Sequence, residues 1–426
     1  MALTILVLVL FLLLIIGLPL PYSLGTAALA GLLAMGEGIP LAVVPQRFVA
    51  GINNFSFMAI PFFLLLGDLM NAAGITRRII RLSNALVGHM PGGLAQVNVV
   101  SSMFFGGISG SATADTASIG SILIPSMKKE GYEGSFSAAL TAASSTAGPI
   151  IPPSILLVLY GVIAGVSITD LFLAGYVPGV MLGLGLLAVS YVISKRRGYP
   201  VHSRASFTEI LVALKESAWA VFMPFLIIGG MLTGVFTVTE AAGVSVIYGL
   251  VVGIVIYGDL KIRDLPGVLA HAMIKIGTLM TVAAAALIFA WVLTIMQVPQ
   301  AMAEAIFVVT ENPLLILLML NILFLAVGMF MEAKAAMLIL LPVILPLLPQ
   351  VGIDPVHFGV VIVFNLLIGL VTPPVGLCLN LAAKIAGVRI DKAAQASMPM
   401  LALMLLVLVV ITYVPGVVLW LPEYLN

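Results

Sequence analysis

A cluster of hydroxyl side chains, glycines and one carboxylate interrupts an otherwise apolar chain over residues 106–126. An unpaired polar group in hydrocarbon costs several kcal/mol, so a helix that faces lipid could not carry this cluster. Hydroxyl, carbonyl and carboxylate oxygens are the ligands that hard cations prefer. The stretch therefore predicts a re-entrant hairpin or a broken helix that lines an ion or substrate site. Its polar side chains include Ser109, Ser111, Thr113, Asp115, Thr116 and Ser118.

Three more interruptions share this character and lie at 145–153, 328–334 and 369–374. Proline has no N–H to donate, so a proline-broken helix leaves carbonyl oxygens free to bind a cation. We therefore predict two cation sites, each formed by one hairpin tip and one broken helix. Sites that are rich in hydroxyls and poor in acids favour Na⁺ over H⁺. The alternative is that glycine and serine only allow close helix packing.

Two acids lie within these interruptions, and acids inside a membrane are functional candidates. Asp115 would either bind an ion or cap the N-terminus of a half-helix. Glu332 would either coordinate an ion or pair with Lys334, and pairing is the favoured alternative.

Composition identifies the protein as a membrane protein. Hydrophobic residues make up 62% of the 426 residues and charged residues only 8%, whereas soluble proteins carry about 25%. Long apolar runs predict helices rather than barrel strands. The net charge of +1 gives no reason to expect a nucleic-acid partner, and no nucleophile–base pair, metal-ligand cluster or phosphate loop predicts an enzyme. The fold class is an all-α polytopic membrane protein of about ten spans and two re-entrant hairpins.

An internal repeat emerges when the chain is shifted by 221 residues. The positive-inside rule places the predicted loop with Arg77, Arg78 and Arg81 in the cytoplasm, together with the end of the first hairpin at Lys128 and Lys129. Each basic segment lies opposite a non-basic one in the other half: Lys128 and Lys129 fall opposite Pro349 and Gln350, while Arg389 and Lys392 fall opposite Ile168 and Leu171. By the positive-inside rule the two halves have opposite orientations, and inverted repeats with broken helices are typical of secondary transporters. Residues that coincide include Gly107 with Gly328, Gly148 with Gly369, Pro152 with Pro373 and Pro153 with Pro374.

The repeat predicts the domain organisation. Each half is expected to contribute five spans and one hairpin. The first repeat covers 1–217, with scaffold spans 1–90, a hairpin and broken helix 91–165, and a linker 166–217. The second covers 218–426, with scaffold spans 218–300, a hairpin and broken helix 301–387, and a final span 388–426.

Five motifs occur in an order that resembles the large membrane subunit of TRAP (tripartite ATP-independent periplasmic) transporters. The resemblance covers essentially the whole chain, and the combination is more specific than any one motif. The motifs are AIPFFLLLGDLMNAAGI (59–75), SGSATADTASIGSILIPSM (109–127), AGPIIPPS (147–154), TVTEAAG (237–243) and LVTPPVG (370–376).

The resemblance implies an elevator-type fold of the ion-transporter superfamily in the bacterial inner membrane. It implies Na⁺-coupled import of a small organic acid, such as a C4-dicarboxylate or the sugar acid sialic acid. Two Na⁺ sites and no organic cofactor are expected. The implied partners are a small four-helix membrane subunit, a periplasmic substrate-binding protein, the organic anion and the lipid bilayer. A stand-alone Na⁺/dicarboxylate symporter of the same superfamily is the alternative.

The resemblance also assigns residues, with one departure from the family pattern. Many members have an aspartate and a Thr/Pro-rich turn where this chain has Glu332-Ala333-Lys334-Ala335, and Lys334 would favour an additional substrate carboxylate. The implied substrate-binding residues are Ser109, Ser111, Thr113, Asp115 and Lys334. The implied Na⁺-site residues are Ser109, Ser111, Ser145, Gly148 and Pro149 for the first site, and Gly328, Met331, Glu332, Thr372 and Pro373 for the second.

Overall fold

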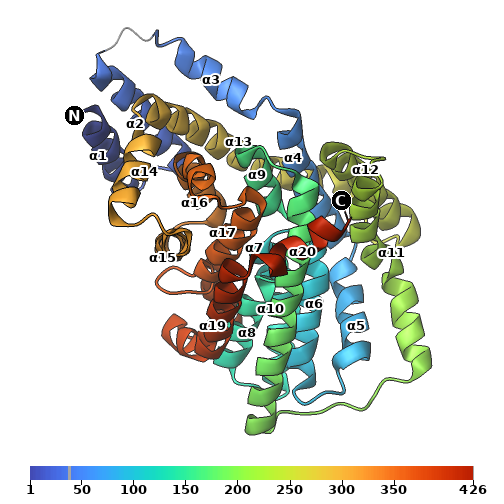
Figure 1. The fold of residues 1–426 in the computed structure, drawn as a ribbon. Helices are drawn as coiled ribbons and strands as arrows, with labels where there is room; N and C mark the ends of the chain where they lie inside the picture. The colour runs from blue at the N-terminus through green and yellow to red at the C-terminus, as the bar shows by residue number, and fades with distance from the viewer. Residues whose placement is uncertain (37–39, 426) are drawn as a thin grey trace.

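The computed structural model describes residues 1–36 and 40–425, and every regular element in these ranges is helical (Figure 1). The helices of the first half are α1 (Ala2–Ile15), α2 (Leu20–Met35), α3 (Val43–Ile52), α4 (Ala59–Ala72), α5 (Ile75–Val87), α6 (Gly93–Ser109), α7 (Ala112–Lys129), α8 (Gly134–Ser145), α9 (Ile155–Ala164) and α10 (Ile168–Arg197). Those of the second half are α11 (Phe207–Leu232), α12 (Val238–Val251), α13 (Leu265–Ile295), α14 (Val298–Val309), α15 (Pro313–Phe330), α16 (Ala333–Ile344), α17 (Pro355–Gly369), α18 (Leu377–Ala386), α19 (Ile390–Tyr413) and α20 (Pro415–Leu425). Short 3-10 turns cover Phe55–Met58, Ile262–Asp264 and Leu345–Val351, and a π-helical turn covers Val252–Ile256.

The helix boundaries repeat at the predicted offset of 221 residues. The first hairpin arms, α6 and α15, end at Ser109 and Phe330, and the second arms, α7 and α16, begin at Ala112 and Ala333. The cis peptide bonds Pro152–Pro153 and Pro373–Pro374 also lie at this offset. Both halves therefore contain the same sequence of a helical hairpin followed by a broken helix.

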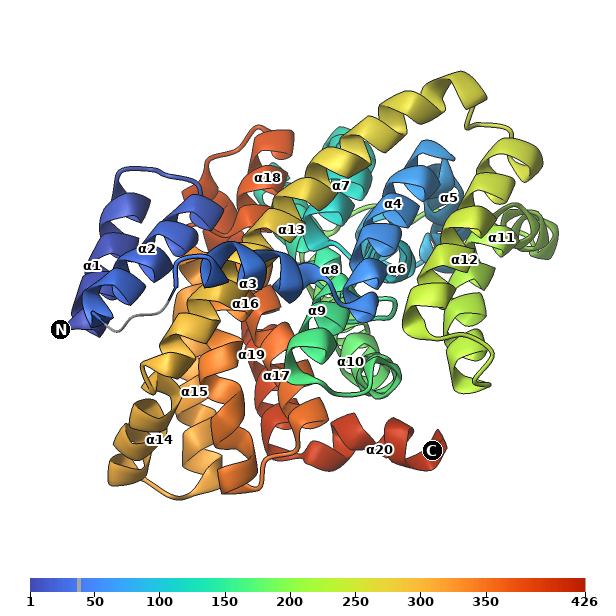
Figure 2. The ribbon, with the colours of Figure 1, turned by 90° about the horizontal axis from the view of Figure 1, so that it is seen from above.

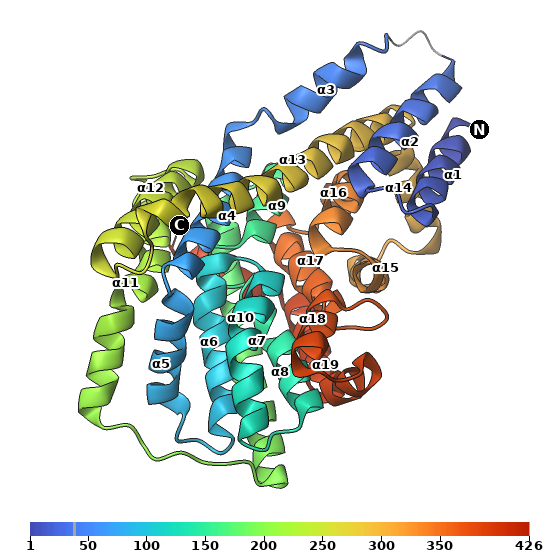
Figure 3. The ribbon, with the colours of Figure 1, turned by 180° about the vertical axis from the view of Figure 1, so that it is seen from behind.

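The two halves interlock rather than standing apart. Helix α2 packs on α13, while α12 packs on α4. The broken helices exchange in the same way: α18 packs on α7 and α8, and α9 packs on α16 and α17. Viewed from above, the long helix α13 crosses the molecule between the α1–α2 pair and the α11–α12 pair (Figure 2). The view from behind shows α18 beside the hairpin helix α7 (Figure 3).

Eight helices in the described residues are long and apolar enough to cross a bilayer. They are Phe55–Ala72, Ile168–Arg197, Phe207–Leu232, Val238–Ile256, Ile262–Ile295, Pro313–Phe330, Ala333–Val351 and Ile390–Tyr413. Helices α8, α9, α17 and α18 are shorter because Gly and Pro divide each of the two broken helices. The prediction of an all-helical polytopic membrane protein is confirmed.

Two local expectations differ from the structure. Most of the region 166–217 that was expected as a linker is helical, in α10 and the start of α11, so only residues 198–206 connect these two helices without regular structure (Figure 1). Arg77, Arg78 and Arg81 lie not in a loop but on the amphipathic helix α5. Ile75, Ile79 and Leu82 recur at helical spacing on its buried side, which leaves Arg77 and Arg81 exposed and Arg78 half-buried at the margin.

Candidate ion and substrate site at the hairpin tips

The two hairpin tips meet at one small cavity of about 20 Å³, enough room for about one water molecule. Ser111 and Thr113 line it from the first hairpin, and Glu332 and Lys334 line it from the second. Pro149 of the first broken helix also lines it. Ser111, Thr113 and Lys334, which were assigned to the substrate site from distant parts of the sequence, therefore line one cavity.

The first hairpin tip directs the N-terminus of α7 toward this cavity. Gly110 has a left-handed backbone with a φ of 58°, which turns the chain after Ser109 ends α6. The Ser111 Oγ accepts a hydrogen bond from the Ala114 N–H at 3.4 Å and shares another with the Thr113 Oγ1 at 3.2 Å. Free N–H groups and the helix dipole make such a terminus attractive to anions.

The carboxylate of Asp115 is completely buried one turn further along α7. Ser102 and Ser145 face it, yet neither carboxylate oxygen has a hydrogen-bond partner of ordinary geometry. The Ser145 Oγ instead donates to the Thr141 carbonyl oxygen at 2.7 Å. Ser111 occupies the N-cap position, so Asp115 is not the cap of α7. A buried carboxylate without compensation is costly, so its oxygens fit a bound cation.

The break between α8 and α9 lies beside the first hairpin. Pro152 and Pro153 have no N–H with which to bond the carbonyl oxygens four residues earlier, at Gly148 and Pro149. The Ser154 hydroxyl donates to the Pro149 carbonyl, which leaves the Gly148 carbonyl as the candidate ligand. A Cβ built on Gly106 would lie 1.9 Å from the Gly148 Cα, so only glycine lets α6 cross so closely. The close crossing brings the break against the hairpin.

The second hairpin tip differs in its electrostatics. Met331 and Glu332 form the extended turn between α15 and α16, and Glu332 pairs with Lys334 at 2.6 Å. The Thr372 Oγ1 donates back to the Ile368 carbonyl at 2.7 Å, just before Pro373 breaks the helix. The favoured ion pair is present, so the Glu332 carboxylate is already compensated in this arrangement.

The crossing of hairpin and broken helix recurs in the second half. A Cβ built on Gly369 would lie 2.3 Å from the Gly328 carbonyl oxygen. Gly328, which was assigned to the second site, therefore touches Gly369 at the start of the predicted break, as Gly106 touches Gly148 in the first half.

A buried polar network that the sequence analysis missed supports both hairpins. Asn98 on α6 donates to the Thr141 Oγ1 at 2.7 Å and accepts from the Ser144 Oγ at 3.1 Å. In the second half Asn365 donates to the Asn321 Oδ1 at 2.7 Å. Ser144 and Asn365 are 221 residues apart, so the same repeat position hydrogen-bonds the broken helix to the hairpin in each half. The available signal was an asparagine inside each apolar hairpin arm.

Comparison with known proteins agrees with this architecture. Residues 7–417 match the family model described as tripartite ATP-independent periplasmic transporter, DctM component. The chain is 40% identical over 408 residues to the sialic acid TRAP transporter large permease protein SiaM of Vibrio cholerae, covering 96% of this chain and 95% of that one. It is 39% identical over 374 residues to the C4-dicarboxylate TRAP transporter large permease protein DctM of Pseudomonas aeruginosa, covering 88% of each.

The fold also resembles a solved transporter of low sequence similarity. The crystal structure of the Alcanivorax borkumensis YdaH transporter, described as having an unusual topology, superimposes with a TM-score of 0.64 at 15% identity, covering 88% of each chain. This similarity concerns the fold alone. The family match and the relatives, by contrast, extend along nearly the whole sequence, so the chain is a transporter permease and not an enzyme, and it belongs to the DctM family of TRAP transporter large permeases.

Proposed function

We propose that this chain is the translocating subunit of a Na⁺-coupled importer of small organic acids in the bacterial inner membrane. The observation that supports this most directly is the meeting of both hairpin tips at one cavity beside the buried carboxylate of Asp115. A monovalent cation would neutralise that carboxylate and so stabilise the first hairpin. Ser109, Ser111, Asp115, Ser145, Gly148 and Pro149 would hold the first ion.

A second Na⁺ site would use Gly328, Met331, Glu332, Thr372 and Pro373. Glu332 is shared with Lys334 in the present arrangement, so its coordination of an ion would require that pair to open. Backbone carbonyls near the Gly328–Gly369 crossing then supply most of the ligands, because the Thr372 hydroxyl is engaged within its own helix.

The substrate is proposed to bind between the tips. The N-terminus of α7, the hydroxyls of Ser111 and Thr113, and the Lys334 ammonium all favour an anion. Organic acids such as sialic acid or a C4-dicarboxylate fit this chemistry, and relatives whose names carry those substrates are similar along most of their length.

The mechanism and partners follow from the arrangement of the halves. Hairpins and broken helices form one interlocked core, which would move as an elevator against the scaffold made by the outer helices. A periplasmic binding protein would deliver the acid, and a small four-helix membrane subunit would complete the complex. The inward gradient of Na⁺ would drive the cycle.

Reconstituted uptake tests the proposal. Proteoliposomes would contain this chain with its small subunit, and loaded binding protein would be added outside with either NaCl or choline chloride. We expect uptake of succinate or N-acetylneuraminate in NaCl alone, its loss in Asp115→Asn, and its retention in Asp391→Asn, an exposed acid at the start of α19. Equal uptake in choline chloride would refute Na⁺ coupling. Full uptake without a binding protein would identify a stand-alone symporter.

A further inference from the structure

A second and much larger cavity, the α5–α7 crevice, lies beside the first hairpin. It has a volume of about 1380 Å³. Helix α7 forms one wall, and the end of α4, α5, α11 and the segment that follows α12 (residues 256–259) form the other. Ser118 of its α7 wall is seven residues beyond Ser111, roughly 10 Å along the helix axis. The crevice therefore lies next to the hairpin-tip site, toward the basic end of α7 that is predicted to be cytoplasmic.

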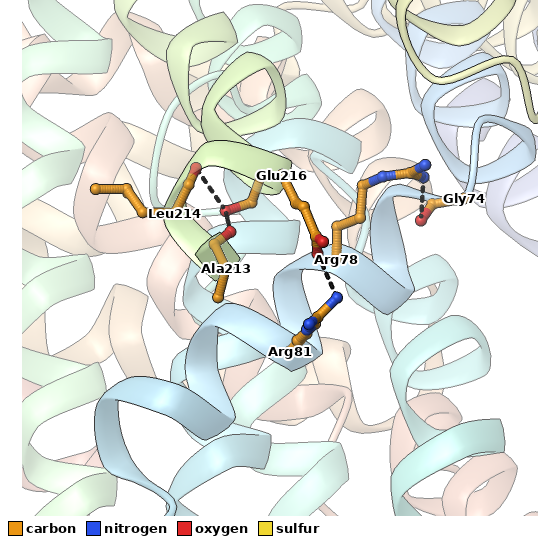
Figure 4. A network of polar contacts seen from close by, with 7 residues as sticks. Gly74, Arg78, Arg81, Ala213, Leu214 and Glu216 are labelled. Carbon is orange, nitrogen blue, oxygen red and sulfur yellow. Dashed lines mark hydrogen bonds and ion pairs between the residues drawn. The ribbon is translucent and has the colours of Figure 1, made fainter. Parts of the chain in front are cut away.

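One arginine of the crevice is fixed in place by the protein itself. Arg78 pairs with Asp259 at 2.6 Å and donates to the Ala73 carbonyl oxygen just after α4. It also donates to the Gly74 carbonyl oxygen (Figure 4). Its guanidinium also lies 3.8 Å from the ring centroid of Tyr257. With all of these contacts satisfied, Arg78 is structural and its charge is compensated.

A second arginine is held more weakly. Arg81 pairs with Glu216 of α11 at 2.6 Å, and both side chains are substantially exposed, at 61% and 39% (Figure 4). Exposed pairs of this kind contribute only about 0–1 kcal/mol. An incoming anion can therefore compete with Glu216 for the Arg81 guanidinium.

Two further cations of the crevice have no such compensation. Arg77 and Lys215 line it, and neither takes part in an ion pair within the described residues. The α7 wall that faces them contributes the uncharged residues Ala117, Ser118 and Ser121. After the two ion pairs are removed, the crevice retains two positive charges and no acid to balance them.

We propose that the α5–α7 crevice is a second anion site, which takes small carboxylates beside the hairpin on its predicted cytoplasmic side. Arg77 and Lys215 attract the anion, and Arg81 joins them when it exchanges Glu216 for the ligand, since guanidinium binds carboxylate in a bidentate manner. The crevice exceeds the ~300–1,000 Å³ of ordinary ligand pockets, so the site is water-filled and weak, as a release path requires. The choice of carboxylates rests on the proposed function; the anion site itself does not.

The rate at which a thiol in the crevice reacts with charged reagents reports the electrostatic potential of the crevice. Cys378 is the chain's one cysteine and is completely buried, so labelling of a Ser121→Cys variant has little background. The variant, co-purified with its small subunit in neutral-lipid nanodiscs at low salt, would react with anionic sulfonatoethyl and cationic trimethylammonium methanethiosulfonate. We expect the anionic reagent to be favoured about tenfold, within the range of electrostatic steering. Adding Arg77→Gln and Lys215→Gln should abolish this preference, whereas Arg196→Gln, an exposed cation outside the crevice, should not.

Protection experiments identify the occupant. Succinate at millimolar concentration should slow the labelling, while neutral succinamide should not. Glu216→Gln frees Arg81 and should lower the succinate concentration that gives half-protection several-fold. An unchanged reagent preference in the double variant, or equal protection by succinamide, would overturn the proposal. If succinate gave no protection and labelling slowed only in nanodiscs that contain phosphatidylglycerol, the occupant of the crevice would be a lipid. That result would also overturn the proposal. None of these readouts depends on Na⁺-driven uptake, so failure of the proposed function is separately visible.

Discussion

Ser111 and Glu332 occupy the same position in the two halves of the chain and line the same cavity. Each is the N-cap residue of the second arm of its hairpin, and they are 221 residues apart. The side chain of Ser111 caps its helix, whereas that of Glu332 makes no capping bond and pairs with Lys334. The same repeat position therefore has two different roles. In the first hairpin it is a hydroxyl that caps a helix near a buried acid, and in the second it is a carboxylate in an ion pair.

The buried acid leads to a prediction for Na⁺-dependent stability. NaCl should stabilise the chain relative to choline chloride at equal ionic strength, by about 2.7 kcal/mol at a hundredfold excess over Kd. Asp115→Asn should abolish this difference and raise the free energy of unfolding in Na⁺-free buffer by about 1–3 kcal/mol, because it removes an uncompensated buried charge. Thermal unfolding in detergent measures both effects.

The matched variants sharpen that experiment. Ser111→Ala should weaken the Na⁺ effect without removing it, because Asp115 remains. Asp391→Asn should leave the effect intact, since this acid is exposed at the start of α19. Identical unfolding curves of the wild type in the two salts would rule out Na⁺ at the hairpin and direct attention to protonation of Asp115.

The glycine crossing leads to a prediction for folding. Gly106→Ala should cost more than about 4 kcal/mol or prevent accumulation of folded protein, because the new Cβ would lie 1.9 Å from the backbone of Gly148. Gly277→Ala is the matched control, since Gly277 lies inside helix α13 with open space around it. That variant should be neutral or more stable by up to about 1 kcal/mol. Size-exclusion profiles and thermal unfolding measure both; similar behaviour of the two variants would contradict the close crossing.

Much of the fold was predictable because its breaks depend on residue type. Only proline removes the backbone N–H groups at 152–153 and 373–374, and only glycine permits the close crossings of hairpin and broken helix. The sequence repeat can therefore be recognised from these prolines and glycines. The register failed in one detail. Gly107 is the sequence equivalent of Gly328, but Gly106 makes the closest crossing in the first half.

The part of the site that escaped prediction depends on long-range packing. The Arg81–Glu216 pair across the crevice joins residues that are 135 positions apart in the sequence. This pair leaves no local signal, because arginine and glutamate at helical spacing are equally suited to a solvated surface. Only the arrangement of α5 against α11 turned the basic stretch after α4 into a cavity wall.

The lysine of the second hairpin leads to a prediction for substrate affinity. Lys334→Gln should raise the concentration of acid that gives half-maximal counterflow by about tenfold, equivalent to about 1.4 kcal/mol. The loss removes a cation from the cavity and leaves the Glu332 carboxylate unpaired and repulsive toward an anion. Lys334→Arg preserves the charge and should retain most of the affinity. A dicarboxylate should lose more than a monocarboxylate; equal losses would argue against a direct contact.

The lysine pair at the end of the first hairpin leads to a prediction for the link between the two halves. The Lys128 Nζ donates to the Ala386 carbonyl oxygen at 2.6 Å and so caps α18, the last part of the second broken helix. Lys128→Met keeps the aliphatic stem but removes this charged bond at a helix C-terminus, and should cost about 1 kcal/mol. Lys129→Met removes the same charge one residue later, where the side chain is exposed, and should change stability by less than about 0.5 kcal/mol. Thermal unfolding of both variants, with and without Na⁺, separates the effect of the hydrogen bond from that of the charge. Equal losses of stability in the two variants would mean that general electrostatics, and not the Lys128–Ala386 contact, stabilises the protein.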